Sequence, residues 1–359
     1  MSKTAVFITI FLLLVGCGRI ADEGDSSIGT KSYGKLQFIT VKKSRFVAND
    51  NIDGGHFQVI VKTVNKPISY ERVDLLEDSN HYALIENGKI KDESVISVQK
   101  TNNAVKSKIL LLLDLSGSIL EGGCSDENSN SVCNQLIRSS NEFIDNIIKN
   151  GAFEIAIYYF NSKKSILPLS AQTEFPTANL TILKNAVKQL QDPYFVNTYL
   201  KGYNSTNLYG AVEQSGEKVC SWTDCENQNG FEIGSVVIFT DGRDLAEIVT
   251  KKEMLKSLKD QIQYYTIGIG NADNKTLAEI SGENHHFEAS QENIQSAFTQ
   301  TYEEILYNSS FYRINYCPAT LEGTIKTKIM FEDKNLGIKT YVQEERITLD
   351  DNIDFRCDI

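Results

Sequence analysis

Continuous apolar runs alternate with segments of helical periodicity over the central part of the chain. Runs such as "KILLLLD", "FEIAIYYF", "GSVVIFT" and "IQYYTIGIG" are apolar at successive positions, as expected for strands covered on both faces. Between them, apolar residues recur every three or four positions, most clearly from Leu136 to Ile148, which predicts amphipathic helices. This alternation predicts an α/β fold with a doubly wound, mostly parallel sheet, whose ligand site lies beyond the carboxyl ends of the central strands.

Two stretches with strand-like alternation flank this central part. Short runs such as "KLQFITV", "HFQVIVKTV" and "ERVDLLED" fill residues 36–103, and "SFYRINY" and "TIKTKIMF" belong to residues 309–359. The ends of an inserted domain usually lie close together, so we expect both flanks to build one β-sandwich-like domain around a central domain at 108–308.

The amino terminus has the pattern of an export signal. Lys3 precedes the apolar run Ala5–Val15, which is shorter than the roughly 20 residues of a membrane-spanning helix. We therefore predict a signal peptide at 1–16. Small residues before Cys17 resemble the lipobox of bacterial lipoproteins, which implies a lipidated Cys17, a flexible tether at 17–35 and an anchor in the bacterial cell envelope, at the outer membrane. The alternative is an ordinary secretory signal with an incidental cysteine.

Charge and cysteine content fit an exported protein. The net charge is −11 and basic residues form no long run, which argues against nucleic-acid binding. Without Cys17, six of the seven cysteines remain, and an even number indicates disulfides in an oxidising compartment. A zinc site is disfavoured because no CxxC pair occurs and His285 and His286 stand alone. Local spacing favours the pairs Cys124–Cys133, Cys220–Cys225 and Cys317–Cys357.

Polar residues with oxygen ligands stand where the buried strands end. Asp114, Ser116 and Ser118 follow the first apolar run at alternate positions, Thr206 precedes a helical stretch, and Asp241 ends another apolar run. Because alternate side chains of extended backbone point to the same side, the first three can converge. Carboxylate and hydroxyl oxygens are hard ligands, so the set predicts Mg²⁺, with Mn²⁺ or Ca²⁺ as alternatives.

These residues resemble the three motifs of the von Willebrand factor type A domain, over about Lys108 to Asn308. The motifs here are "DLSGS" from Asp114, "STNLYGA" around Thr206, and "TDG" around Asp241. The resemblance implies a Rossmann-like fold and a complete metal-ion-dependent adhesion site. In that site Ser116, Ser118 and Thr206 would bind through hydroxyls, and Asp114 and Asp241 directly or through water. It also implies that the metal captures an Asp or Glu carboxylate of a protein ligand.

Three alternatives stay open at this stage. Ser, Thr and Asp are also common helix caps, so the set could serve local structure alone. The metal could serve folding or envelope assembly without adhesion. A metal-assisted hydrolase is disfavoured, because the four histidines fall outside the three motifs and neither HExxH nor a Ser-His-Asp order occurs. We therefore predict a binding protein and not an enzyme.

Overall fold

The computed structural model describes residues 106–309, with gaps at 125–129, 151, 204, 224–231, 260–261, and on either side the strands between 35 and 101 and between 311 and 357. The predicted signal peptide, the lipidation site and the tether up to residue 34 therefore lie outside the described residues, as does the strand predicted for "ERVDLLED", whereas Lys35 at the end of the tether already belongs to a strand.

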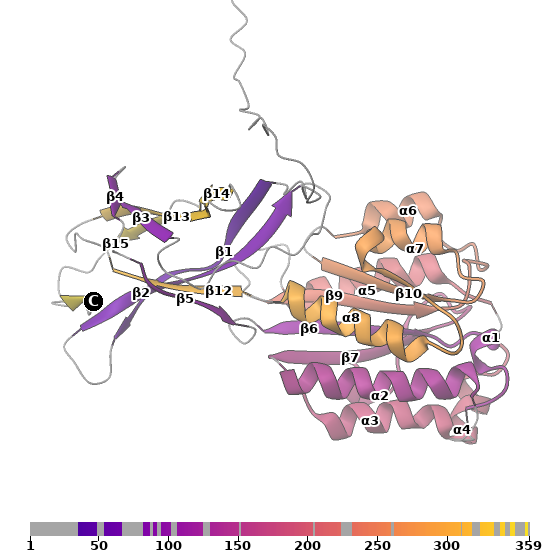
Figure 1. Ribbon diagram of the computed structural model, residues 1–359. Helices are drawn as coiled ribbons and strands as arrows, with labels where there is room; N and C mark the ends of the chain where they lie inside the picture. Colours follow the sequence, from indigo (N-terminus) through magenta and orange to yellow (C-terminus); the bar gives the residue numbers. More distant parts are fainter. Residues whose placement is uncertain are drawn as a thin grey trace, which may run out of the picture. The chain divides into compact units, whose positions relative to one another are not determined.

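A six-stranded sheet forms the centre of the α/β part (Figure 1). All neighbouring strands pair in parallel except β8, which is antiparallel to β7. The mostly parallel, doubly wound sheet predicted from the sequence is thus confirmed. In spatial order its strands are β11 (His286–Ala289), β10 (Ile262–Ile269), β9 (Ile233–Thr240), β6 (Ser107–Asp114), β7 (Phe153–Phe160) and β8 (Leu167–Pro168).

Helices cover both faces of this sheet (Figure 1). One face carries α2 (Val132–Asn150), α3 (Leu180–Lys188) and α8 (Ile294–Asn308), and the other α5 (Leu208–Thr223), α6 (Lys251–Ser257) and α7 (Asn274–Ser281). Short elements lie between them, namely α1 (Gly117–Leu120), η2 (Ala171–Thr173), η3 (Gln189–Gln191), α4 (Pro193–Phe195), the π-helical turn η4 (Val196–Leu200) and η5 (Glu283–His285).

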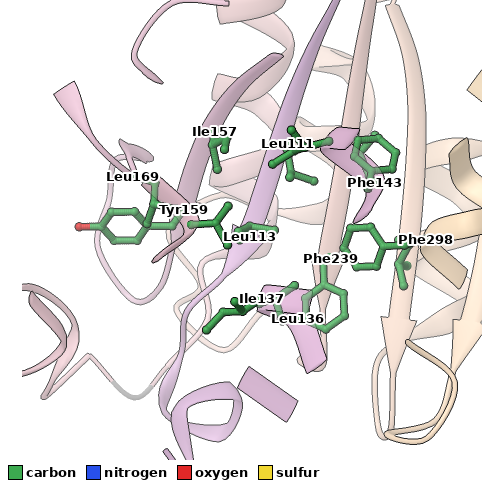
Figure 2. Packing of buried hydrophobic residues seen from close by; sticks show 14 of the residues in the cluster. Leu111, Leu113, Leu136, Ile137, Phe143, Ile157, Tyr159, Leu169, Phe239 and Phe298 are labelled. Carbon is green, nitrogen blue, oxygen red and sulfur yellow. The ribbon is translucent and has the colours of Figure 1, made fainter. Parts of the chain in front are cut away.

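The position of strand β6 explains why four leucines follow one another in its sequence. Leu111 and Leu113 pack in the cluster under α2, α3 and α8, whereas Leu110 and Leu112 pack in the cluster under α5, α6 and α7. All four side chains are fully buried. Figure 2 shows Leu111 near Phe143, and Phe239 beside Phe298 with ring centroids 5.9 Å apart. A strand buried on both faces has no polar side until it leaves the sheet.

Two further sheets combine strands from both flanking segments. The first has the order β1-β2-β12-β5, with β16 beside β2, and the second β14-β13-β3-β4, with β15 beside β13. The strands before the α/β part are β1 (Lys35–Ala48), β2 (Gly54–Lys66), β3 (Tyr82–Glu86), β4 (Lys89–Lys91) and β5 (Val95–Thr101). Those after it are β12 (Phe311–Tyr316), β13 (Thr324–Asp333), β14 (Ile338–Tyr341), β15 (Glu345–Thr348) and β16 (Arg356–Cys357).

None of the helices in the described part is both long and apolar enough to cross a membrane.

Candidate metal centre

Two of the three predicted motifs follow neighbouring parallel strands. Asp114 is the last residue of β6, and Asp241 comes directly after Thr240, the last residue of β9. Because β6 and β9 pair in parallel, their carboxyl ends meet at one edge of the sheet. Residues more than a hundred positions apart in sequence are thereby brought into contact.

Oxygen atoms of the two motifs form a connected chain. The Oγ of Ser118 donates to Asp241 Oδ1 at 3.1 Å. The Oγ atoms of Ser116 and Ser118 lie 3.3 Å apart. Ser116 is fully buried, Ser118 is exposed and Asp241 is half-buried, so the chain leads from the interior to the surface.

Asp114 is a carboxylate without solvent access. Its Oδ1 accepts from the backbone N–H of Ser116 at 2.9 Å and its Oδ2 accepts from Thr240 Oγ1 at 2.6 Å. Burial, and secondly the nearby Asp241, raise the pKa of Asp114 to about 7, against the opposing effect of these hydrogen bonds. Burial also raises the pKa of Asp241. In the absence of a cation, both carboxyl groups are therefore harder to ionise than usual.

The third motif reaches the site through a close backbone contact. Thr206 is buried, with 3% of its surface exposed. A Cβ atom on Gly242 would lie 2.9 Å from Thr206 Oγ1, so this approach requires glycine directly after Asp241. The carbonyl of Thr206 also accepts from Leu245 N at 2.9 Å.

The helix-cap alternative does not account for the hydroxyl groups. Ser116 occupies the N-cap position of α1, yet its side chain makes no capping hydrogen bond. At the start of α5 it is Asn207 and not Thr206 that caps, with its Oδ1 accepting from Gly210 N at 3.3 Å. The hydroxyls of Ser116 and Thr206 are therefore not used to cap the helices that follow them.

Three of the five predicted metal ligands line one surface hollow. Ser118, Thr206 and Asp241 line it, and its volume is about 460 Å³. Asp114 and Ser116 lie beneath and do not line it. Thr240 and Gly242 belong to the predicted "TDG" motif but had no predicted role, and the lining residues Arg243 and Leu245 were not predicted. No pattern in the sequence marks Arg243 and Leu245.

The donor set fits a divalent cation that prefers oxygen. Octahedral Mg²⁺ with bonds of about 2.1 Å places neighbouring ligand oxygens about 3.0 Å apart, and longer Ca²⁺ bonds place them about 3.4 Å apart. The spacings of 3.1 and 3.3 Å between the Ser118 oxygen and its two neighbours match this range. Within the described part of the chain, no three His, Cys, Asp or Glu side chains gather into a possible metal site. The two carboxylates and three hydroxyls of the predicted residues are oxygen donors of the type that a hard cation prefers.

A disulfide closes the connection between the first motif and α2. Cys124 and Cys133 are bonded, with Cα atoms 5.2 Å apart. Cys220 and Cys317 each take part in a disulfide as well. The side chains of Cys225 and Cys357 lie outside the described part, so the pairings Cys220–Cys225 and Cys317–Cys357 stay predictions.

Comparison with known proteins identifies the family. The family model of the von Willebrand factor type A domain matches residues 108–303, more than half of the chain. The chain belongs to the von Willebrand factor type A domain family. The matched type A domain spans all three motifs and ends within α8. Among curated proteins, none matches this chain.

Solved structures from several organisms are similar to parts of this chain. Proximal thread matrix protein 1 from the mussel byssus, with a zinc-occupied MIDAS motif, has 18% identity and a TM-score of 0.42, covering 57% of this chain and 49% of that chain. A von Willebrand factor type A protein from Catenulispora acidiphila has 11% identity and a TM-score of 0.39, and the match covers 91% of this chain and 76% of that chain. The manganese-loaded TRAP protein of Plasmodium vivax has 14% identity and a TM-score of 0.39, and the match covers 70% of this chain and 96% of that chain. The chain spans about half the length of the mussel protein, and the metals named belong to those proteins.

Proposed function

We propose that the type A domain binds a divalent cation through Asp114, Ser116, Ser118, Thr206 and Asp241 and uses it to hold a carboxylate of a partner protein. The supporting observation is the contact of Ser118 Oγ with Asp241 Oδ1 at the rim of the hollow. It joins two separate motifs through oxygens that lie at the spacing of metal ligands. The cation is Mg²⁺, with Mn²⁺ or Ca²⁺ as alternatives.

The predicted metal ligands differ in how deeply they are buried, and their roles differ accordingly. Asp114 supplies buried negative charge, and Thr240 and the Ser116 amide hold its two oxygens in place. Ser118, Thr206 and Asp241 face the hollow, where a partner can approach. The two carboxylates only balance the charge of a divalent ion, so the protein adds no excess negative charge that would repel another anion. The ion can therefore accept an incoming Asp or Glu side chain at an open coordination position. Such a role is binding and not catalysis.

Titration with metal tests the site. Isothermal titration of the full-length protein with Mg²⁺ and Mn²⁺ is expected to give one binding site, lost in Asp241→Ala and Ser118→Ala. Glu217→Ala, which removes an exposed carboxylate of α5 that does not line the hollow, is the matched control. Equal metal affinity in all these variants would refute the assignment.

Chelation separates adhesion from a structural use of the metal. If the site captures a partner, EDTA abolishes partner binding while the circular dichroism of the protein stays native. Loss of the folded signal in EDTA would support a structural role instead.

We also propose that the chain is a lipoprotein of the bacterial cell envelope, anchored at the outer membrane through Cys17, with residues 36–103 and 309–359 forming one β domain. The pattern around Cys17 supports the anchor, and the pairing of β12 with both β2 and β5 supports the joint domain. Labelling cells with a palmitate analogue tests the anchor: the wild type is expected to be labelled and Cys17→Ser is not.

A further inference from the structure

A large apolar side chain, that of Leu245, stands exposed beside the candidate metal centre. Leu245 is 67% exposed and Ile248 is 42% exposed. Both belong to the segment from Gly242 to Ile248, called here the Leu245 loop, which directly follows Asp241. An exposed leucine alone needs no explanation, but here it lines the same hollow as Ser118, Thr206 and Asp241.

The Leu245 loop is fixed to the metal-binding motif by its backbone. The carbonyl of Thr206 accepts from Leu245 N at 2.9 Å and from Ala246 N at 3.2 Å. The exposed side chain of Leu245 is therefore carried on a backbone bonded to a predicted metal ligand. Its position relative to the cation is set by the same residue that would bind the cation.

The carboxylate of Asp244 links the Leu245 loop to α5 and also bonds within the loop. Asp244 Oδ1 accepts from Tyr209 N at 3.0 Å, and Asp244 Oδ2 accepts from Glu247 N at 3.1 Å. Glu247 adopts a positive φ of 52°, which a residue other than glycine keeps only where its surroundings impose it. Both oxygens of Asp244 thus bond to the backbone, and the loop has a defined shape.

The hollow has chemically different sides. Arg243, an exposed cation, and Leu245 line it on the Leu245 loop. Val132 and Gln291 line it from other elements, and Gln291 Nε2 donates to the carbonyl of Asn130 at 2.7 Å beside the Cys124–Cys133 loop. A volume of about 460 Å³ falls in the range of roughly 300–1,000 Å³ that holds a drug-sized ligand. That is space for a few side chains of a peptide segment.

We infer that the Leu245 loop selects the partner, and that the captured segment carries a large apolar side chain within two positions of its metal-binding Asp or Glu. This inference rests on the proposed function, because the carboxylate must bind the cation at Ser118 and Asp241. The neighbouring apolar side chain then covers Leu245, which removes apolar surface of both partners from water. Arg243 adds a positive charge at the rim, which favours a segment that is acidic beyond the one carboxylate.

A peptide array tests the inference with the full-length protein. The array carries hexapeptides with one fixed Glu and with Leu or Ser at each neighbouring position, and binding is measured in Mg²⁺ and in EDTA. In Mg²⁺ the wild type is expected to bind peptides with Leu within two positions of Glu about tenfold more tightly than the Ser peptides, the effect of burying about one leucine side chain.

Variants assign this preference to the loop. Leu245→Asn is expected to reduce the ratio to about twofold or less, whereas Leu245→Met keeps it because the side chain stays apolar. Phe175→Asn is the matched control, since Phe175 is 66% exposed and does not line the hollow. Titration of every variant with Mg²⁺ alone checks the metal site, and loss of Mg²⁺ affinity in Leu245→Asn would overturn the inference by making Leu245 a structural residue.

The outcomes separate this inference from the proposed function. Mg²⁺-dependent binding with no apolar preference, or an unchanged preference in Leu245→Asn, overturns the inference and leaves the proposed function standing. Absence of any Mg²⁺-dependent peptide binding by the wild type overturns carboxylate capture and the inference with it.

Discussion

Thr240 donates a hydrogen bond of 2.6 Å from its Oγ1 to Oδ2 of Asp114, across two neighbouring strands of the central sheet. Both side chains are fully buried. The Thr240 hydroxyl also accepts from Gly242 N at 3.1 Å. One hydroxyl thus ties the first motif to the turn that carries Asp241, so the geometry of the candidate metal centre depends on a residue that does not line it.

Replacing Thr240 by valine tests this link. Thr240→Val keeps the shape but leaves a buried carboxylate oxygen without its donor, which costs about 1–3 kcal/mol. We expect that loss of unfolding free energy in EDTA at pH 8, measured by urea denaturation, together with weaker Mg²⁺ binding. Thr301→Val is the control, because Thr301 is equally buried but donates within α8 to the carbonyl of Ala297. Equal effects of both substitutions on Mg²⁺ affinity would contradict the link.

The raised pKa of Asp114 predicts a pH dependence of stability without metal. Burial raises this pKa from an ordinary value near 4 to about 7, so the folded state binds a proton that the unfolded state releases. The stability from Asp114 is therefore fully present below about pH 4 and is lost as the pH rises through about 7. In EDTA, the unfolding free energy of the wild type is expected to fall relative to that of Asp114→Asn between pH 4.5 and 8. Parallel pH profiles of the two proteins would contradict this expectation.

Mg²⁺ is expected to reverse this trend. A cation favours the ionised carboxylates, so its stabilising effect should grow as the pH rises through about 7, where Asp114 loses its proton. Thermal denaturation with and without Mg²⁺ at pH 6 and pH 8 measures the difference. A shift in melting temperature that is the same at both pH values would show that Asp114 is not coupled to the metal.

Gly242→Ala is expected to weaken metal binding more than folding. The added Cβ would lie 2.9 Å from Thr206 Oγ1, so either the Thr206 side chain or the turn at residue 242 must shift. We expect a loss of Mg²⁺ affinity of about tenfold or more, equivalent to about 1.4 kcal/mol, in isothermal titration. Thr206→Ser keeps the hydroxyl and should bind Mg²⁺ like the wild type, whereas normal affinity in Gly242→Ala would show that Thr206 is not a ligand.

Removing the Cys124–Cys133 bridge is expected to destabilise the protein. The bonded residues are nine positions apart, and closing a loop of about this length contributes about 2–3 kcal/mol in the chain-entropy model. Denaturation of the variant Cys124→Ala/Cys133→Ala measures this loss without reducing the other disulfides. An unchanged denaturation midpoint would contradict this expectation.

The sequence by itself determined the fold class and the location of the candidate site. The apolar runs of β6 and β9 could be buried only between two helical layers, and parallel strands must end at a common edge. Asp114 and Asp241 were thereby assigned to one place before any contact was known. Whether a segment is a helix or a strand follows from the spacing of apolar residues that are close together in the sequence.

Only the tertiary structure decided how the residues at that edge interact. The Thr240–Asp114 bond joins residues 126 positions apart, and no local pattern specifies a distance between them. The raised pKa of Asp114 comes from the complete exclusion of water by surrounding elements, and the exposed position of Leu245 from the bonds of its loop to Thr206 and to α5. These properties depend on packing between distant segments, because burial and bonding geometry belong to the assembled site and not to any one stretch of chain.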